Sequence, residues 1–330
     1  MRITNQMMAN NYLRDMGNNL NNMQNLNNQL SSGKEIRKPS DNPFKVARSM
    51  QLNSDINTNK QYNENIKDTT NWLDTTDESL SQVTNVIQRV RELMVASGNA
   101  AYGQDEKKAI ADEVNERVSE LGQILNTNFD GKYVFGGTKS SSKPLDVNKN
   151  ALTGLNELEL IDKNGNTLAL DSTDPIVKNQ IGMIRTKLEA EVSQGVTMEY
   201  NVNALEILDF KNDKGKEVDV MKLLKDITNN LVSTDITDTS KIINENLAGI
   251  DNVVTNLLKI RAEVGAKQNR MESAQTNNED ANYSMTDILS KTEDIDFTSK
   301  TIEFSMAQTV YQAALQVSAK VLPKTLLDFL

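Results

Sequence analysis

The two residue types that most enzymes use near neutral pH, cysteine and histidine, are both missing from this 330-residue chain. Their absence excludes thiolate and imidazole nucleophiles, an imidazole general base, and the usual ligands of zinc. Carboxylate pairs remain, at Asp112 with Glu116 and at Asp294 with Asp296. Acidic residues at these spacings are common on exposed helix faces and at helix caps, so we interpret both pairs in that way.

Two further segments contain the residue types of ligand-binding loops. Asp162–Asn166 has the acidic and amide residues of a calcium loop, but its glycine comes two positions early and the closing glutamate is missing. We interpret it as a hairpin turn. Gly136 and Gly137 are not followed by the Gly-Lys-Ser/Thr of a phosphate loop. The sequence therefore predicts no catalytic residues, no cofactor and no metal site, and we expect a protein that is not an enzyme.

Charge and hydropathy limit the partners. The net charge is −10 and the pI is near 4.8, so no nucleic acid is expected. No apolar run is long enough to span a bilayer and the start has no secretory signal, so no membrane is expected and the chain looks cytoplasmic unless a dedicated machine exports it. Residues 1–60 carry eight Lys or Arg against four Asp or Glu. Opposite charge poles could help copies to stack, although such a bias is also usual for solvated surface.

The elements that must carry any function are dominated by apolar residues spaced seven apart. Such a repeat lays a seam along a helix, and the seam needs a partner helix. We expect a long helix from about Pro43 to Ser97 that is capped by Ser40 or Asp41, a helix from Gln104 to Asn126, and a returning helix alongside the first. The predicted rod-packing residues are Leu73, Leu80, Ile87, Met94, Ile243, Ile250, Leu257, Val264 and Met271.

Each end of the chain is predicted to form an amphipathic helix. Residues 7–30 have an apolar stripe diluted by asparagine, a poor helix former, and Gly33 is expected to end this helix. The stripe could pack on its own domain or on a neighbouring subunit, and a matching stripe after residue 301 favours the neighbour. The predicted subunit-interface residues are Leu13, Met16, Leu20, Met23, Leu30, Ile302, Met306, Val310, Val317, Val321, Leu327 and Phe329.

The middle of the chain changes its period from seven to two, as in strands. We expect a short strand pair around Asp130, a strand at Leu158 pairing with one at Leu168, a hairpin around Gly195, and a helix at Val218–Val232. The predicted fold class is mainly α with an inserted α+β domain: the N- and C-terminal halves form a long antiparallel helical rod, with a β-rich domain in the middle. The expected domains are 1–42 (assembly helix and connector), 43–139 (rod), 140–238 (inserted domain), 239–300 (rod) and 301–330 (assembly helix).

Several segments resemble the flagellin family. They are Leu30–Gly33, Arg89–Leu93 and, most specifically, Arg261–Arg270. Within the family the chain is more similar to subunits of the hook-filament junction than to filament flagellin. The segments that carry this resemblance are Met1–Thr4, Pro39–Pro43, Trp72 with Leu73, Gly131–Gly137 and Leu326–Leu330. The resemblance covers about residues 1–139 and 240–330. It departs at Asn42, where the family usually has Asp, and is loose in the middle domain.

The resemblance implies a flagellin-like structural protein of the bacterial flagellum, an adapter at the junction of hook and filament. Such a protein is extracellular, exported by the flagellar type III apparatus without a cleaved signal peptide, and held unpolymerised by a cytoplasmic chaperone that binds the C-terminal region. Its other partners would be copies of itself in a ring-like layer, the hook-side junction protein and flagellin. Two alternatives stay open: filament flagellin itself, and a cytosolic coiled-coil scaffold, which explains the heptads but not two striped ends around a β insert.

Overall fold

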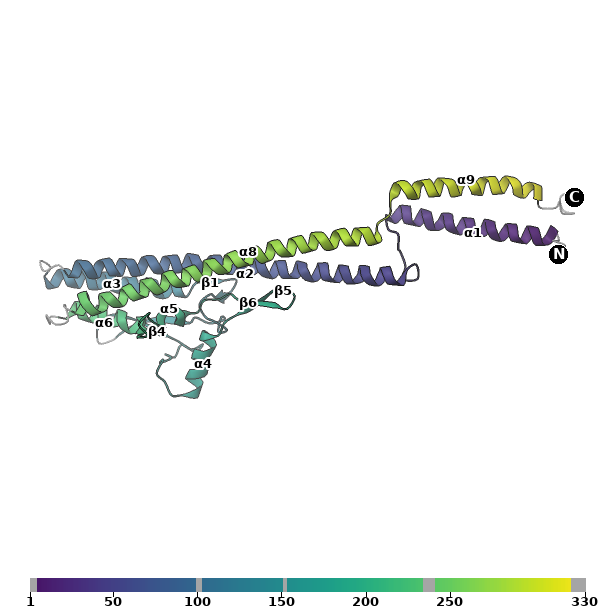
Figure 1. Ribbon diagram of the computed structural model, residues 1–330. Helices are drawn as coiled ribbons and strands as arrows, with labels where there is room; N and C mark the ends of the chain where they lie inside the picture. Colours follow the sequence, from purple (N-terminus) through teal and green to yellow (C-terminus); the bar gives the residue numbers. More distant parts are fainter. Residues whose placement is uncertain (1–4, 99–102, 151–152, 234–240, 322–330) are drawn as a thin grey trace. The chain divides into compact units, whose positions relative to one another are not determined.

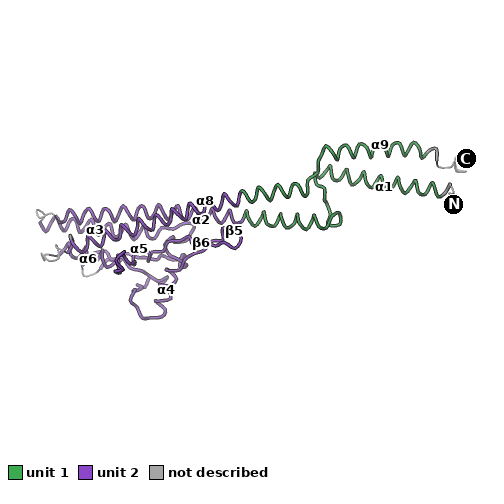
Figure 2. The backbone as a smooth tube through the Cα atoms, in the orientation of Figure 1, with its two compact units in different colours: residues 1–60, 280–330 green, residues 61–279 purple. Residues whose placement is uncertain are grey.

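The structure, a computed structural model, describes residues 5–98, 103–150, 153–233 and 241–321. It divides into two compact units (Figure 2). Unit 1 comprises residues 1–60 and 280–330, and unit 2 comprises residues 61–279. Unit 1 is built from α1 (Asn5–Ser32), α9 (Phe297–Val321), the beginning of α2 (Pro43–Ser97) and the end of α8 (Leu247–Glu293), as Figure 1 shows.

Unit 2 combines long helices with small hairpins. The remainder of α2 and α8 is joined by α3 (Gln104–Leu125), α4 (Pro175–Arg185), α5 (Ala204–Leu208), α6 (Val220–Val232) and the π-helical turn η1 (Ile242–Asn246). The strands of the described residues form separate antiparallel pairs: β1 (Asn128–Phe129) with β2 (Lys132–Tyr133), β3 (Leu145–Lys149) with β4 (Asn156–Leu160), β5 (Glu189–Ser193) with β6 (Val196–Glu199), and β7 (Asp209–Lys211) with β8 (Glu217–Asp219). The predicted mainly α fold class with strands in the middle is confirmed.

The core of unit 2 lies between α2, α3, α6 and α8. It is one hydrophobic cluster, and all of its buried members fall between Ile66 and Met271. The heptad residues of α2 and α8 lie along the length of this cluster. The predicted rod-packing residues found there, each at most 1% exposed, are Leu73, Leu80, Ile87, Met94, Ile250, Leu257, Val264 and Met271. The side chain of Ile243 lies outside the described residues. A seven-residue period thus places one apolar row of each long helix in a shared core.

Ion pairs and a hydrogen bond beside the core show that α2 and α8 run antiparallel in unit 2. Arg91 binds Asp251, Asp77 binds Arg261, and Asp74 accepts a hydrogen bond from Gln268. From one pair to the next, the residue number on α2 decreases as the residue number on α8 increases. The two sequence-distant halves therefore pair as the heptads predicted.

The connector between α1 and α2 is fixed by backbone geometry and caps. Helix α1 ends at Ser32 because Gly33 takes φ +71°, as predicted. The cap of α2 is Asn42, whose Oδ1 accepts the Lys45 N–H at 3.1 Å. Sequence reasoning favoured Ser40 or Asp41 as the cap, and this was wrong. Asp41 instead accepts the N–H groups of Arg37 and Lys38 and closes the connector on itself.

One strand pairing also differs from the prediction. β4 pairs with β3, with Leu158 opposite Val147 and Leu160 opposite Leu145. The predicted partner around Leu168 makes only an isolated bridge, between Ile161 and Thr167. The other predicted strand pairs, β1 with β2 and β5 with β6, are confirmed. Across the parts of the chain that the structure describes, no helix is both long and apolar enough to cross a membrane.

Candidate assembly interface

The terminal helices α1 and α9 lie side by side in unit 1 (Figure 1). On α1 the shielded side chains recur every three or four residues, and Leu26 is only 6% exposed. On α9 the half-buried residues follow the same rhythm and are Lys300, Phe304, Ala307, Tyr311, Ala314 and Ser318. The Tyr12 hydroxyl donates to the Ala314 carbonyl across the pair. Each terminal helix therefore uses one narrow face to hold the other.

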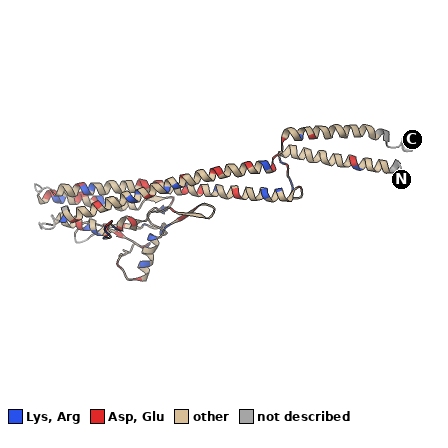
Figure 3. Ribbon diagram, in the orientation of Figure 1, with Lys and Arg blue, Asp and Glu red and all other residues tan. Residues whose placement is uncertain are grey.

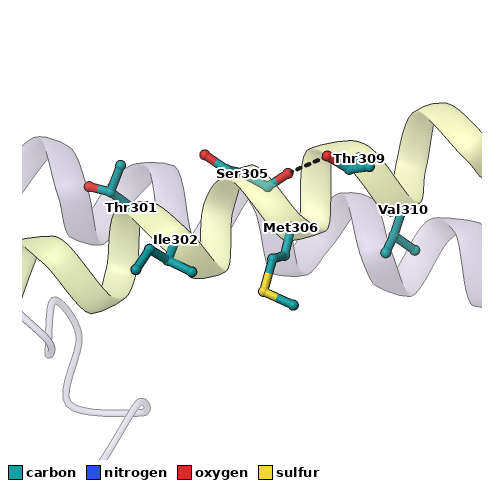
Figure 4. Close-up of a pocket in the computed structure, with 6 residues that line it drawn as sticks. All are labelled: Thr301, Ile302, Ser305, Met306, Thr309 and Val310. Carbon is teal, nitrogen blue, oxygen red and sulfur yellow. Dashed lines mark hydrogen bonds between the residues drawn. The ribbon is translucent and has the colours of Figure 1, made fainter.

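The opposite face of α9 is apolar and uncovered. Ile302, Met306 and Val310 are 56%, 64% and 59% exposed and project from the same side of the helix, where they line a shallow depression with Thr301, Ser305 and Thr309 (Figure 4). Leu315 and Val317 are also exposed. Uncovered apolar side chains gathered on one surface are typical of a contact site for another protein.

The predicted interface residues of α1 fall into two groups. Leu13 and Leu20 are 51% and 48% exposed, on the outside of the helix. Met16, Met23 and Leu30 are half-buried. The α9 residues Ile302, Met306, Val310 and Val317 all point outward. The side chain of Val321, and residues Leu327 and Phe329, lie outside the described residues.

The connector after α1 and the connector between α8 and α9 pair with each other at one end of the two terminal helices. Lys34 forms an antiparallel bridge with Asp294, and the Ile295 N–H donates to the Gly33 carbonyl at 3.1 Å. The Lys34 ammonium lies 2.6 Å from Asp294 Oδ1 and 3.0 Å from Glu293 Oε2. The hydrogen bond from Lys34, together with one from Ser290, holds the pKa of the Asp294 carboxyl below its ordinary value. The pKa of Lys34 is raised, chiefly by its hydrogen bond to Asp294.

Sequence reasoning missed the ion pairs that border the α2–α8 seam. Arg261 binds Asp77 through two parallel contacts, Nε to Oδ1 at 3.0 Å and Nη2 to Oδ2 at 3.2 Å. Gln268, seven residues later, donates to Asp74 at 2.7 Å. Polar residues seven apart beside a heptad seam are the signal that could have found them. The contacts give the family-like segment Arg261–Arg270 a structural role, the alignment of the two long helices.

The residues considered for chemistry have structural roles. Asp112 and Glu116 are exposed on α3, while Asp296 caps α9 by accepting the Thr298 and Ser299 N–H groups. Asp162 Oδ1 accepts the N–H groups of Asn164 and Asn166 in a turn, and these bonds hold the pKa of Asp162 below its ordinary value. Within the described ranges, no cluster of three acidic residues is arranged to hold a metal ion.

Comparison with known proteins agrees with this architecture. A family model described as the bacterial flagellin N-terminal helical region matches residues 3–140, and one described as the bacterial flagellin C-terminal helical region matches residues 247–330. The chain belongs to the flagellin family. The two matched flagellin regions contain α1, α2, α3, α8 and α9, so the family accounts for the terminal pair and for the heptad seam.

Flagellar hook-associated proteins and flagellins are both similar to this chain over almost its whole length. Flagellar hook-associated protein 3 of Escherichia coli is 24% identical over 95% of each chain, and the flagellin of Halalkalibacterium halodurans is 26% identical over all of each. Among solved structures, a putative flagellar hook-associated protein from Vibrio parahaemolyticus superposes with a TM-score of 0.60 at 18% identity, covering 77% of this chain and all of that one. Flagellar hook-associated protein 3 of Legionella pneumophila gives 0.58 at 16%, covering 73% and 98%. The flagellin-like fold and a structural place in the bacterial flagellum follow.

Proposed function

We propose that this flagellin-family chain is a structural subunit of the hook-filament junction, and that it assembles through the outward faces of α1 and α9. The observation that carries the proposal is the row of exposed apolar side chains on α9, with Met306 64% exposed. Burying one such side chain contributes about 1.5–3 kcal/mol, so several together can drive association. The predicted interface residues are assigned to this contact, with Met16, Met23 and Leu30 contributing from the rim of the α1–α9 pair.

The place at the junction is supported by relatives named flagellar hook-associated protein 3 and by the segments Pro39–Pro43 and Trp72–Leu73. Filament flagellin is the second candidate, because flagellins match over the full length at similar identity. Stoichiometry separates the two. A junction subunit is a minor band in sheared flagella, whereas a filament flagellin is the dominant band.

The partners follow from this place in the assembly. They are copies of the chain in a ring-like layer, the hook-side junction protein on one side and flagellin on the other. We include export by the flagellar apparatus without a cleaved signal peptide, and a cytoplasmic chaperone that covers the C-terminal region beforehand. The role of a chaperone fits the exposed face of α9, which would otherwise associate prematurely. No enzymatic step is assigned to the chain.

Five functional segments are part of the proposal. Residues 1–42 and 301–330 provide assembly helices, 43–139 and 239–300 the two halves of the helical rod, and 140–238 the inserted domain. Because the buried cluster of unit 2 includes no residue from α1 or α9, assembly contacts and the internal core are assigned to different parts of the sequence.

A deletion strain complemented with variants tests the proposal. The deletion should release flagellin into the medium, and the unaltered gene should restore filaments. Leu20→Asp and Met306→Asp place a charge on the outward faces and should abolish restoration. The matched controls Asn21→Asp and Gln308→Asp alter exposed polar neighbours on the same helices and should restore filaments fully. Filament growth supported by both apolar-to-Asp variants would contradict the assignment of these faces.

A further inference from the structure

The proposed assembly leaves an aromatic cleft of unit 2 without a role. It has a volume of about 560 Å³, and we call it the Trp72 cleft; it is lined by Asp68, Trp72, Phe129, Asp130, Lys132 and Tyr200. The rings of Phe129 and Tyr200 each meet the Trp72 ring edge to face, with centroids 6.0 Å apart. The cleft is thus built from three packed aromatic residues contributed by α2, β1 and the segment after β6.

The polar groups of the Trp72 cleft favour a cationic occupant. The carboxylates of Asp68 and Asp130 are exposed at its edge and outnumber the single ammonium of Lys132. Glu64, one helical turn before Asp68, is a further exposed carboxylate. Trp72 is 94% buried, and its Nε1 is buried without an acceptor among the described residues, so the ring forms the floor of the cleft. Aromatic rings flanked by carboxylates bind a guanidinium both by stacking and by charge.

Unit 1 offers such a cation on a rigid turn. In residues 37–41, the connector turn, Asp41 Oδ2 accepts the Arg37 N–H at 3.1 Å and the Lys38 N–H at 2.9 Å. The side chains of Arg37 and Lys38 point outward and have no ion pair among the described residues, whereas Lys34 and Lys45 are paired. The loop backbone is held while the guanidinium of Arg37 stays available.

The connector region of unit 1 and unit 2 carry opposite net charges. Residues 33–48 carry five Lys or Arg against two Asp or Glu, a net +3. Unit 2 carries 24 Lys or Arg against 35 Asp or Glu, a net −11. Figure 3 shows where charged residues of both signs lie along the ribbon. In a layer of identical subunits, every acidic cleft therefore has a basic turn available from another copy.

We propose that the Trp72 cleft of one copy binds Arg37 of a neighbouring copy. The guanidinium lies between Asp68 and Asp130 against the aromatic floor, and Lys38 contributes charge at the rim. The contact fixes which neighbour docks and in which orientation, because charge pairs at an interface select partner and register. This inference rests on the proposed function, since it requires neighbouring copies in one layer.

Cross-linking between two single-cysteine variants tests the contact, and the cysteine-free chain gives no background. Ser40→Cys, in the connector turn, and Asn71→Cys, one helical turn after Asp68, alter exposed residues and leave Arg37 and Asp68 unchanged. They are expressed together in the deletion strain, and isolated flagella are treated with a short bismaleimide. A dimer that needs both variants is expected. Asp226→Cys, an exposed aspartate on α6 outside the cleft, is the matched control and should give none with Ser40→Cys. Absence of the Ser40–Asn71 dimer from flagella that contain both variants would overturn the inference.

A charge exchange provides the second measurement. Arg37→Asp and Asp68→Arg should each lower incorporation into flagella at least tenfold, and the double variant should recover most of it. A double variant no better than either single one would overturn the contact. The proposed function fails separately, if the unaltered chain does not restore filaments to the deletion strain.

Discussion

At the scale of single residues, the space around the backbone determines whether Gly137 can be replaced by a residue with a Cβ. This glycine has φ +59°, and a Cβ there would lie 2.6 Å from the Met183 carbonyl oxygen and would also meet that of Ile184. We predict that Gly137→Ala lowers the free energy of unfolding of unit 2 by about 2–4 kcal/mol, since it combines left-handed strain with a backbone clash. Urea unfolding followed by circular dichroism measures this.

Gly131 is the matched control for Gly137. Its φ is +75°, but a Cβ there meets nothing within 4 Å. Gly131→Ala should therefore cost only the conformational strain, about 1–2 kcal/mol. Equal costs at the two positions would mean that the carbonyls of α4 do not confine Gly137.

The Arg261–Asp77 fork tests how the long helices are aligned. Lysine carries the same charge but cannot make both contacts, so we predict that Arg261→Lys destabilises unit 2 by up to about 1 kcal/mol, the range for partly exposed pairs. Arg270→Lys alters an exposed arginine of α8 without a described partner and should be neutral. Thermal unfolding of both variants measures the difference. Identical melting temperatures would show that the paired Arg261–Asp77 contacts do not stabilise unit 2.

The contribution of the paired connectors to the stability of unit 1 should depend on pH through Asp294. Its carboxyl pKa is lowered in the folded chain, so it contributes stability that is present above the ordinary pKa of 3.8 and is lost as the pH falls through the folded value. We predict that Asp294→Asn destabilises unit 1 by about 0.2–1 kcal/mol at pH 7. The difference should vanish at pH values below the folded pKa.

Urea unfolding at several pH values measures the effect. Asp280→Asn, at an exposed carboxylate without a described partner, is the control and should show no such dependence. A loss at Asp294→Asn that stays constant down to the most acidic point would show that the carboxylate charge is not its source.

At the scale of elements, the helices could be predicted because their signals are local and periodic. The bounds Pro43–Ser97 agree with the sequence prediction, since Pro43 and the heptads define both the beginning and the face of α2. Strand pairing could not be predicted in the same way. Alternation shows which faces of Leu158 and Leu160 are buried, but it does not identify β3 as the partner.

The candidate interface shows a similar limit. The sequence identifies apolar rows on α1 but cannot tell which row meets α9, because both rows have helical spacing. In the structure Leu26 is shielded while Leu13 and Leu20 are exposed. The inward face of α9, with Phe304 and Tyr311, was not predicted, since alanines between the aromatic residues weaken the apolar signal.

The seam and the terminal helices should respond differently to substitution. Leu80 and Leu257 are fully buried, so Leu80→Ala and Leu257→Ala should each cost about 2–5 kcal/mol in the isolated monomer. Leu20 is 48% exposed, and Leu20→Ala should cost less than about 0.5 kcal/mol. Aspartate at each of these three positions should give the same ranking, with larger falls in melting temperature at Leu80 and Leu257 than at Leu20. Comparable losses at all three positions would mean that the outward face of α1 is already covered in the monomer.

At the scale of the whole molecule, stability and assembly are divided between the two units. The buried cluster of unit 2 begins at Ile66 and ends at Met271, and its partly buried neighbours lie between Ile110 and Ala274. Unit 1 instead has exposed apolar faces on both terminal helices. A chain with this division can fold its centre before the ends find their partners.

Truncation should therefore separate folding from assembly. We predict that removal of residues 1–30 or of 312–330 leaves the melting temperature of unit 2 within a few degrees of the full chain, because neither segment contributes to its buried cluster. Both truncations should abolish restoration of filaments in the deletion strain, since each removes one side of the α1–α9 pair. Calorimetry and filament counts measure the two effects. A truncated chain that supports filaments would place the assembly surface in unit 2, and the acidic Trp72 cleft would then be the first surface to test in its place.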